Sequence, residues 1–132
     1  MSIVVGYIPT AEGEAALTRA IEETLRHQDR LVVVNSSRGE ALVDNHFVQP
    51  EQAATLENRL QQAGIAYELV QPLRGHDAAE EVLTAAEEHQ ADLIVIGLRK
   101  RTPVGKMIMG STAQRILLQS TCSVLAVKAA QI

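Results

Sequence analysis

The segment GLRKRTPVGKMIMGST, residues 97–112, contains the residue types best suited to binding chemistry. Gly97 and Gly110 bracket a basic stretch, and Ser111 and Thr112 follow the second glycine. Glycine lets a backbone turn tightly or approach a ligand closely, and the N–H groups at a helix start attract anions. A strand that ends at Gly97, a basic loop and a helix that opens at Gly110 and Ser111 would therefore form a phosphate-binding site.

A purely structural interpretation of the same segment stays open. Ser111 and Gln114 have the spacing of a capping box, so Ser111 can be the N-cap of its own helix. Gly97 can serve only a tight strand exit, and the basic side chains can form an ordinary solvated loop. The segment is not a Walker P-loop, because Lys106 is followed by Met107 rather than by serine or threonine.

Composition places the chain among globular proteins. With 132 residues, 46% hydrophobic and 21% charged, we expect one domain over residues 1–132. A net charge of −4 and the absence of tryptophan argue against nucleic acid as a partner. Cys122 is the only cysteine, and we find neither a signal peptide nor an apolar run long enough for a membrane helix. We therefore expect a cytoplasmic protein with no membrane partner.

Short apolar runs predict the strands. The runs at residues 3–7, 31–35, 93–97 and 123–128 are nearly continuous and rich in valine and isoleucine. This pattern is typical of parallel strands that are buried on both faces. The run at residues 66–70 alternates with polar residues instead, which is typical of an edge strand.

Segments with helical spacing lie between these runs. Helices are predicted over 50–63, which opens with Pro50, and over 76–89, where Asp77 and Glu80 have capping-box spacing. The first helix is expected to bury one apolar stripe: Ala16, Leu17, Ala20, Ile21 and Leu25. The paired acids of the helices are expected on solvated faces: Glu22-Glu23, Glu80-Glu81 and Glu87-Glu88. Alternating strands and helices predict an α/β fold with a doubly wound, mostly parallel sheet.

Other candidate groups show no catalytic or metal-binding pattern. The four histidines lack ligand spacing, and Cys122 is expected to be a small buried hydrophobe. The polar connection at residues 36–49 is a candidate lid. Because aromatic residues are scarce, a base would have to be held by Ile8 and by the strand end at Asn35 and Ser36.

The order of elements, together with GHDAAEEVLTAAEEHQADLIVIG, the basic loop and GSTAQRILLQSTCSVLAVK, resembles the universal stress protein (UspA-like) family. The likeness covers essentially the whole chain. Nucleotide-binding members of the family carry Gly-x2-Gly-x9-Gly-Ser/Thr after the fourth strand. This chain has Gly97-x2-Lys100-x9-Gly110-Ser111 in the same frame.

The resemblance implies a flavodoxin-like fold, also described as adenine nucleotide alpha hydrolase-like, with five parallel strands in the order 3-2-1-4-5. It implies a homodimer through the last strand, about Ser123 to Lys128, and an ATP site, with or without Mg²⁺. The phosphates would lie against Gly97, Lys100, Gly110, Ser111 and Thr112, and the nucleoside against Ile8, Pro9 and Ser36.

Two residues depart from the family pattern. Lys100 stands at the second glycine position, where its side chain either obstructs the phosphates or contacts them as a point charge. Ile8 stands where ATP-binding relatives usually have an aspartate, so a carboxylate that can bind the nucleoside is missing.

We expect a stress-response regulator or sensor that binds ATP and is not an enzyme, since no base or water-positioning residue accompanies the loop. Its regulatory protein partner is unknown. The alternative is a nucleotide-free member that acts as a dimerisation and protein-interaction module. A flavin enzyme of flavodoxin-like fold is disfavoured, and we expect a colourless protein.

Overall fold

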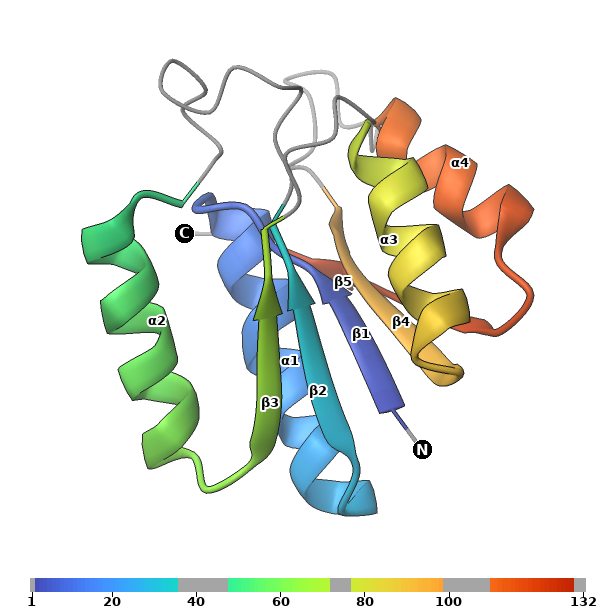
Figure 1. Ribbon diagram of the computed structural model, residues 1–132. Helices are drawn as coiled ribbons and strands as arrows, with labels where there is room; N and C mark the ends of the chain where they lie inside the picture. The colour runs from blue at the N-terminus through green and yellow to red at the C-terminus, as the bar shows by residue number, and fades with distance from the viewer. Residues whose placement is uncertain (1, 36–47, 72–76, 99–109, 130–132) are drawn as a thin grey trace.

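A computed structural model describes residues 2–35, 48–71, 77–98 and 110–129 (Figure 1). Ser36, Lys100, His46, His76 and residues 36–47 of the candidate lid lie outside these ranges. The elements are β1 (Ser2–Gly6), α1 (Ala11–His27), β2 (Arg30–Val34), α2 (Pro50–Gln62), β3 (Ala66–Val70), α3 (Ala78–Glu88), β4 (Ala91–Leu98), α4 (Ser111–Gln119) and β5 (Ser123–Lys128).

The strands form one parallel sheet in the order β3-β2-β1-β4-β5, which confirms the expected fold class. Figure 1 shows three layers, with α1 and α2 on one face of the sheet and α3 and α4 on the other. All strands point the same way, so their carboxyl ends meet at one edge. Strand order reverses between β1 and β4, and this edge is where a ligand site is expected in such sheets.

Two apolar clusters form the core because successive side chains of a strand point to opposite faces. Ile3 and Val5 of β1 pack toward α1 and α2, whereas Val4 packs toward α3 and α4. Burial on both faces is confirmed for β1 and β2 and for the centre of β4. The prediction holds only in part for β5, whose four middle residues pack against the clusters on both faces but are half-buried rather than buried. Among the described strands, β5 lies at the edge of the sheet and pairs with β4 alone.

The apolar stripe of α1 is confirmed except at its end. Ala16, Leu17 and Ala20 are fully buried, but Leu25 is 51% exposed. Thr24 takes the buried position instead, because it follows Leu17 by seven residues and so lies on the same helix face. Its hydroxyl donates to the carbonyl of Ala20 over 2.8 Å, which satisfies the polar group in the core.

The solvated-face prediction is wrong for two of the paired acids. Glu81 is 4% exposed and Glu23 is 7% exposed. The Glu23 carboxylate lies under long side chains from its own helix, with Arg26 at 2.8 Å and Arg19 at 3.3 Å. The guanidinium groups of those arginines compensate the charge of the carboxylate.

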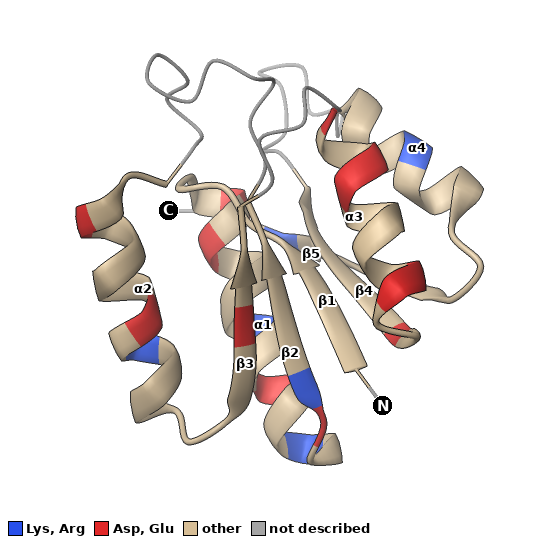
Figure 2. Ribbon diagram, in the orientation of Figure 1, with Lys and Arg blue, Asp and Glu red and all other residues tan. Residues whose placement is uncertain are grey.

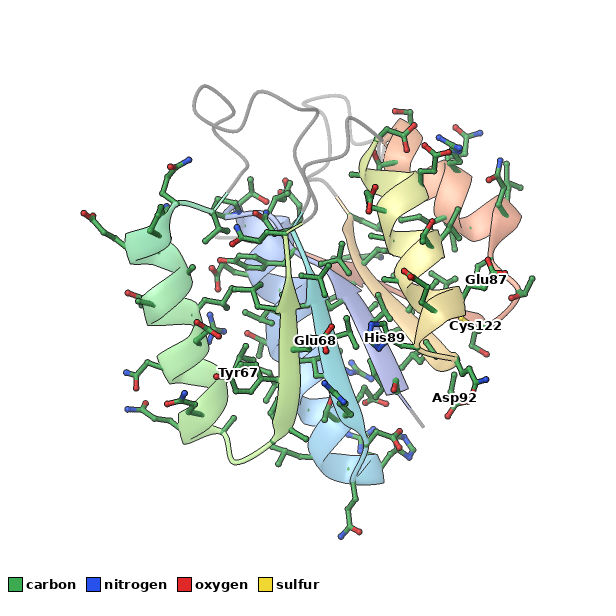
Figure 3. All side chains as sticks on the ribbon, viewed as in Figure 1. Tyr67, Glu68, Glu87, His89, Asp92 and Cys122 are labelled. Atoms are coloured by element: carbon green, nitrogen blue, oxygen red, sulfur yellow. The ribbon has the colours of Figure 1, made fainter. Side chains whose placement is uncertain are left out.

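Charged side chains of the described residues lie mainly on the helices, and the strands carry few (Figure 2). One cluster joins three elements near the β3 edge. Arg30 donates to Glu68 over 2.9 Å, and the second oxygen of Glu68 lies 3.6 Å from His89 after α3. Glu68 lies at the middle of β3, and Figure 3 shows His89 farther still from the carboxyl edge of the sheet. No described helix combines the length and the apolar character needed to cross a membrane.

Candidate functional site

The start of α4, at the carboxyl edge, has no side-chain cap among the described residues. Gly110 is the N-cap, with extended backbone angles (φ −67°, ψ 160°) and no side-chain cap. The first intrahelical bond is the one that Gln114 N donates to Gly110 O, over 3.0 Å. The amides of the first turn therefore have no acceptor within the helix, and the side chains of Ser111 and Thr112 are exposed. Ser111 is the first helical residue, so the alternative in which it is the N-cap of its own helix is wrong.

The other three helices begin at the same edge with polar caps. Thr10 accepts from Gly13 N over 3.1 Å at the start of α1, and Asp77 accepts from Glu80 N over 2.8 Å at the start of α3. At α2, the side chain of Gln52 accepts from the amide of Gln49 over 2.9 Å. Among the four described helix starts, α4 therefore differs in having a glycine at the N-cap, which has no side chain to accept from the first-turn amides.

Gly97 has a packing reason to be glycine. It lies inside β4, which continues to Leu98, and so does not end the strand as expected. A Cβ atom at Gly97 would lie 2.1 Å from the carbonyl oxygen of Glu12, in the first turn of α1. A Cβ atom at Gly13 would likewise lie 1.8 Å from the carbonyl oxygen of Ile8. The two glycines therefore let α1 begin tightly packed between the end of β1 and β4.

The residues that follow β1 have apolar side chains. Ile8 and Pro9 are half-buried, and Thr10 N donates to Ile8 O over 2.8 Å, which closes a three-residue turn around Pro9. The hydroxyl of Thr10 is engaged in capping α1. A ligand here would meet the side chain of Ile8 by dispersion contacts rather than by a hydrogen bond to a carboxylate.

Tyr7, just before this turn, ties three elements together. Its hydroxyl donates to Glu14 over 2.5 Å, and Arg59 of α2 donates to the other oxygen of Glu14 over 2.5 Å and to Thr18 over 3.0 Å. Burial and the nearby carboxylate raise the pKa of Tyr7 well above its usual value. Burial alone would raise the pKa of Glu14, but the hydrogen bonds from Tyr7 and Arg59 outweigh it and lower that pKa.

The side chain of Asn35, at the end of β2, is hydrogen-bonded inside the protein and leaves only the backbone of this strand end for a base. It is fully buried, and its amide group donates to the carbonyl of Tyr7 over 2.9 Å. Its oxygen accepts from Val48 N over 2.7 Å and from Gln71 over 3.1 Å. Sequence reasoning missed Gln71 and this network; the one signal was a polar residue directly after four apolar ones in β2.

The remaining candidates lie away from the edge or are already paired. Arg115 of α4 donates to Asp77 and so compensates the acid that caps α3. Cys122 is half-buried rather than buried, touches Ser120 at 3.4 Å, and lies at the far end of α4 from Ser111 (Figure 3). Within the described ranges, no group of three histidine, cysteine or acidic side chains is arranged to hold a metal ion.

The family model for the universal stress protein family matches residues 1–128. The chain is 46% identical over 126 residues to a universal stress protein of Mycolicibacterium smegmatis, with 96% of each chain covered. It therefore belongs to the universal stress protein family.

Solved structures agree with this assignment. A universal stress protein of Archaeoglobus fulgidus superposes with a TM-score of 0.81 at 29% identity, covering 97% of this chain and 98% of that one. A second one from the same organism, in complex with dAMP, has a TM-score of 0.66 at 20% identity and covers 97% and 98% of the two chains. An Arabidopsis thaliana family protein with AMP bound has a TM-score of 0.66 at 12% identity, covering 98% and 92%.

Proposed function

We propose that this chain is a cytoplasmic, homodimeric universal stress protein that binds ATP, with or without Mg²⁺, as a regulatory ligand. The observation that carries the proposal is the start of α4 at the carboxyl edge, where Gly110 provides no side chain to cap the first-turn amides. Exposed Ser111 and Thr112 add hydroxyl donors at the same place. Dipole and amides together favour a phosphate there.

Strand order reverses between β4, which leads toward α4, and β1. The nucleoside would lie at the β1 side, against Ile8 and Pro9. The dAMP and AMP in the complexes of the two relatives named above support an adenine nucleotide for this chain as well. The sequence places Lys100 and Ser36 in the segments that follow β4 and β2, and we assign them phosphate and nucleoside contacts respectively. Magnesium would arrive with the phosphates, which usually complete its coordination.

ATP would act as a ligand rather than as a substrate. A bound nucleotide shifts a protein toward the conformation or partner that it favours, and this needs no chemical step. The unidentified regulatory protein would then bind one of the two forms preferentially.

The homodimer would form through β5. Its outer edge is not paired with any described strand, and its middle residues Val124 to Val127 are only half-buried. An exposed strand edge of this kind pairs readily with a second copy. Sedimentation equilibrium should give the mass of two chains, and the mass of a single chain would contradict this part of the proposal.

A second candidate function is a nucleotide-free interaction module. Two observations favour it. Ile8 offers no carboxylate to a nucleoside, and Gly97 is explained by its contact with Glu12 without any ligand. In this case only the dimer surface and a protein partner would matter.

Calorimetric titration with Mg-ATP separates the two candidates. Wild-type protein should bind, and Gly110→Val should abolish binding, because a branched side chain would stand at the approach to the α4 amides. Thr121→Val, an exposed change at the far end of α4, is the matched control and should bind like wild type. Wild-type affinity in Gly110→Val would refute the assignment of α4, and a wild-type protein that ignores Mg-ATP would favour the second candidate.

A further inference from the structure

Asn35 forms a buried polar brace at the edge where the nucleoside is expected. Its amide group donates to the carbonyl of Tyr7 after β1, and its own backbone amide donates to Val70 O in β3 over 2.9 Å. Its side-chain oxygen accepts from the backbone of Val48, just before α2. One residue with a fully buried side chain therefore ties together the ends of three strands and the approach to a helix.

Gln71 completes the brace from β3. Its amide group donates to the Asn35 oxygen over 3.1 Å and to the carbonyl of Val48 over 2.8 Å. Val48 is thus held at both its N–H and its C=O, and it is itself 2% exposed. Buried polar groups are costly when they lose a partner, so removing one donor disturbs the whole arrangement.

We propose that Asn35 is a positioning residue for the nucleoside, an inference that rests on the proposed function. Its bond to the Tyr7 carbonyl fixes the backbone directly before Ile8 and Pro9. The same side chain also holds the backbone of Val48. The end of β1 and the start of α2 are therefore fixed relative to each other. Because Ile8 can hold a nucleoside only by shape and dispersion, its placement matters more than it would beside a hydrogen-bonding carboxylate.

The test uses two probes on the intact protein. ATP engages both ends of the site, whereas inorganic tripolyphosphate engages only the α4 end. Asn35→Asp keeps the shape of the side chain but removes the donor to Tyr7. It should weaken ATP binding about tenfold or more, as expected when a buried hydrogen bond is lost, and leave tripolyphosphate affinity within about twofold of wild type.

A low-pH measurement separates positioning from general destabilisation. Protonation gives the new carboxyl of Asn35→Asp an O–H donor, so its deficit for ATP, relative to wild type at each pH, should shrink between about pH 8 and pH 5.5. Gln71→Met, at a half-buried site, should weaken ATP binding without this recovery. Ile3→Val, at the opposite end of β1, is the control for lost stability alone and should bind both probes like wild type.

Failure of the inference differs from failure of the proposed function. If wild type binds ATP and both Asn35→Asp and Gln71→Met bind it within twofold, the brace does not position the nucleoside. An equal loss for ATP and tripolyphosphate would also overturn the inference. A wild-type protein that binds neither probe overturns the proposed function, and the inference falls with it. Should Asn35→Asp fail to fold, Gln71→Met decides alone.

Discussion

The starts of α3 and α4 face the same edge of the sheet but differ in how their first-turn amides are capped. At α3, Asp77 supplies a carboxylate that accepts from Glu80 N, and Arg115 compensates its charge. At α4, Gly110 supplies no side chain, and the exposed Ser111 and Thr112 follow. The protein thus places its own anion at the start of α3, whereas in the proposed function a bound phosphate takes that place at α4. The difference teaches that a missing cap, and not a glycine by itself, marks the candidate site.

The largest expected effect distinguishes two glycines of the same motif. Gly97→Ala should lower the free energy of unfolding by about 3 kcal/mol, since its Cβ would lie 2.1 Å from the backbone oxygen of Glu12. Gly110→Ala should lower it by about 1 kcal/mol or less, because extended backbone angles suit alanine. Urea unfolding measures both. Equal losses would show that the two glycines do not differ in role.

Gly110→Asp makes the start of α4 resemble that of α3. The carboxylate would cap the helix and raise stability by about 0.5 kcal/mol. It would also occupy the phosphate position, so ATP affinity should fall about 100-fold, or about 2.7 kcal/mol. Thermal unfolding and calorimetric titration of the same sample report the two effects. A parallel fall in both stability and affinity would argue that α4 is merely disrupted.

The reverse change, Asp77→Ala, removes the cap of α3. It should lower the free energy of unfolding by about 1 kcal/mol, which is typical of a lost N-cap. ATP affinity should stay within about twofold of wild type, because α3 holds no ligand in this account. A large loss of ATP binding would instead place Asp77 or Arg115 in the site.

The smallest expected effect concerns pH. The pKa of Glu14 is lowered in the folded protein, so its ionised form contributes stability that is fully present above its unfolded value of 4.5. That contribution is lost as the pH falls through the lower folded value. Glu14→Gln should therefore reduce the fall in urea midpoint between about pH 6 and pH 3. The change will be small because the pair with Arg59 is partly exposed. An unchanged fall would contradict the assignment.

Most of the fold was predictable because buried parallel strands and helix stripes leave periodic apolar patterns. The runs at residues 3–7 and 31–35 fell within one residue of β1 and β2. The burial of Leu25 was mispredicted because Thr24 takes the buried position instead. The hydroxyl of Thr24 is satisfied by a hydrogen bond to the carbonyl of Ala20 in the same helix. Glu23 was mispredicted because the arginines that cover it lie on the same helix.

The candidate site was predictable only in part. The open cap at Gly110 leaves a local signal in sequence, whereas the contact of Gly97 with Glu12 joins residues far apart in the chain. The same holds for Asn35, whose partners Tyr7, Val48 and Gln71 come from three separate segments. Contacts of this kind depend on strand order and register, which no spacing rule contains.

The most direct test of the central claim is to denature freshly purified protein and separate the released small molecules by anion-exchange chromatography at 260 nm. With two tyrosines and no tryptophan, the chain itself absorbs weakly. We predict released adenine nucleotide or, for protein purified empty, a gain of about 2.7 kcal/mol in stability when Mg-ATP reaches 100 times its dissociation constant. Protein that releases nothing and whose unfolding temperature does not change with added Mg-ATP would contradict the account.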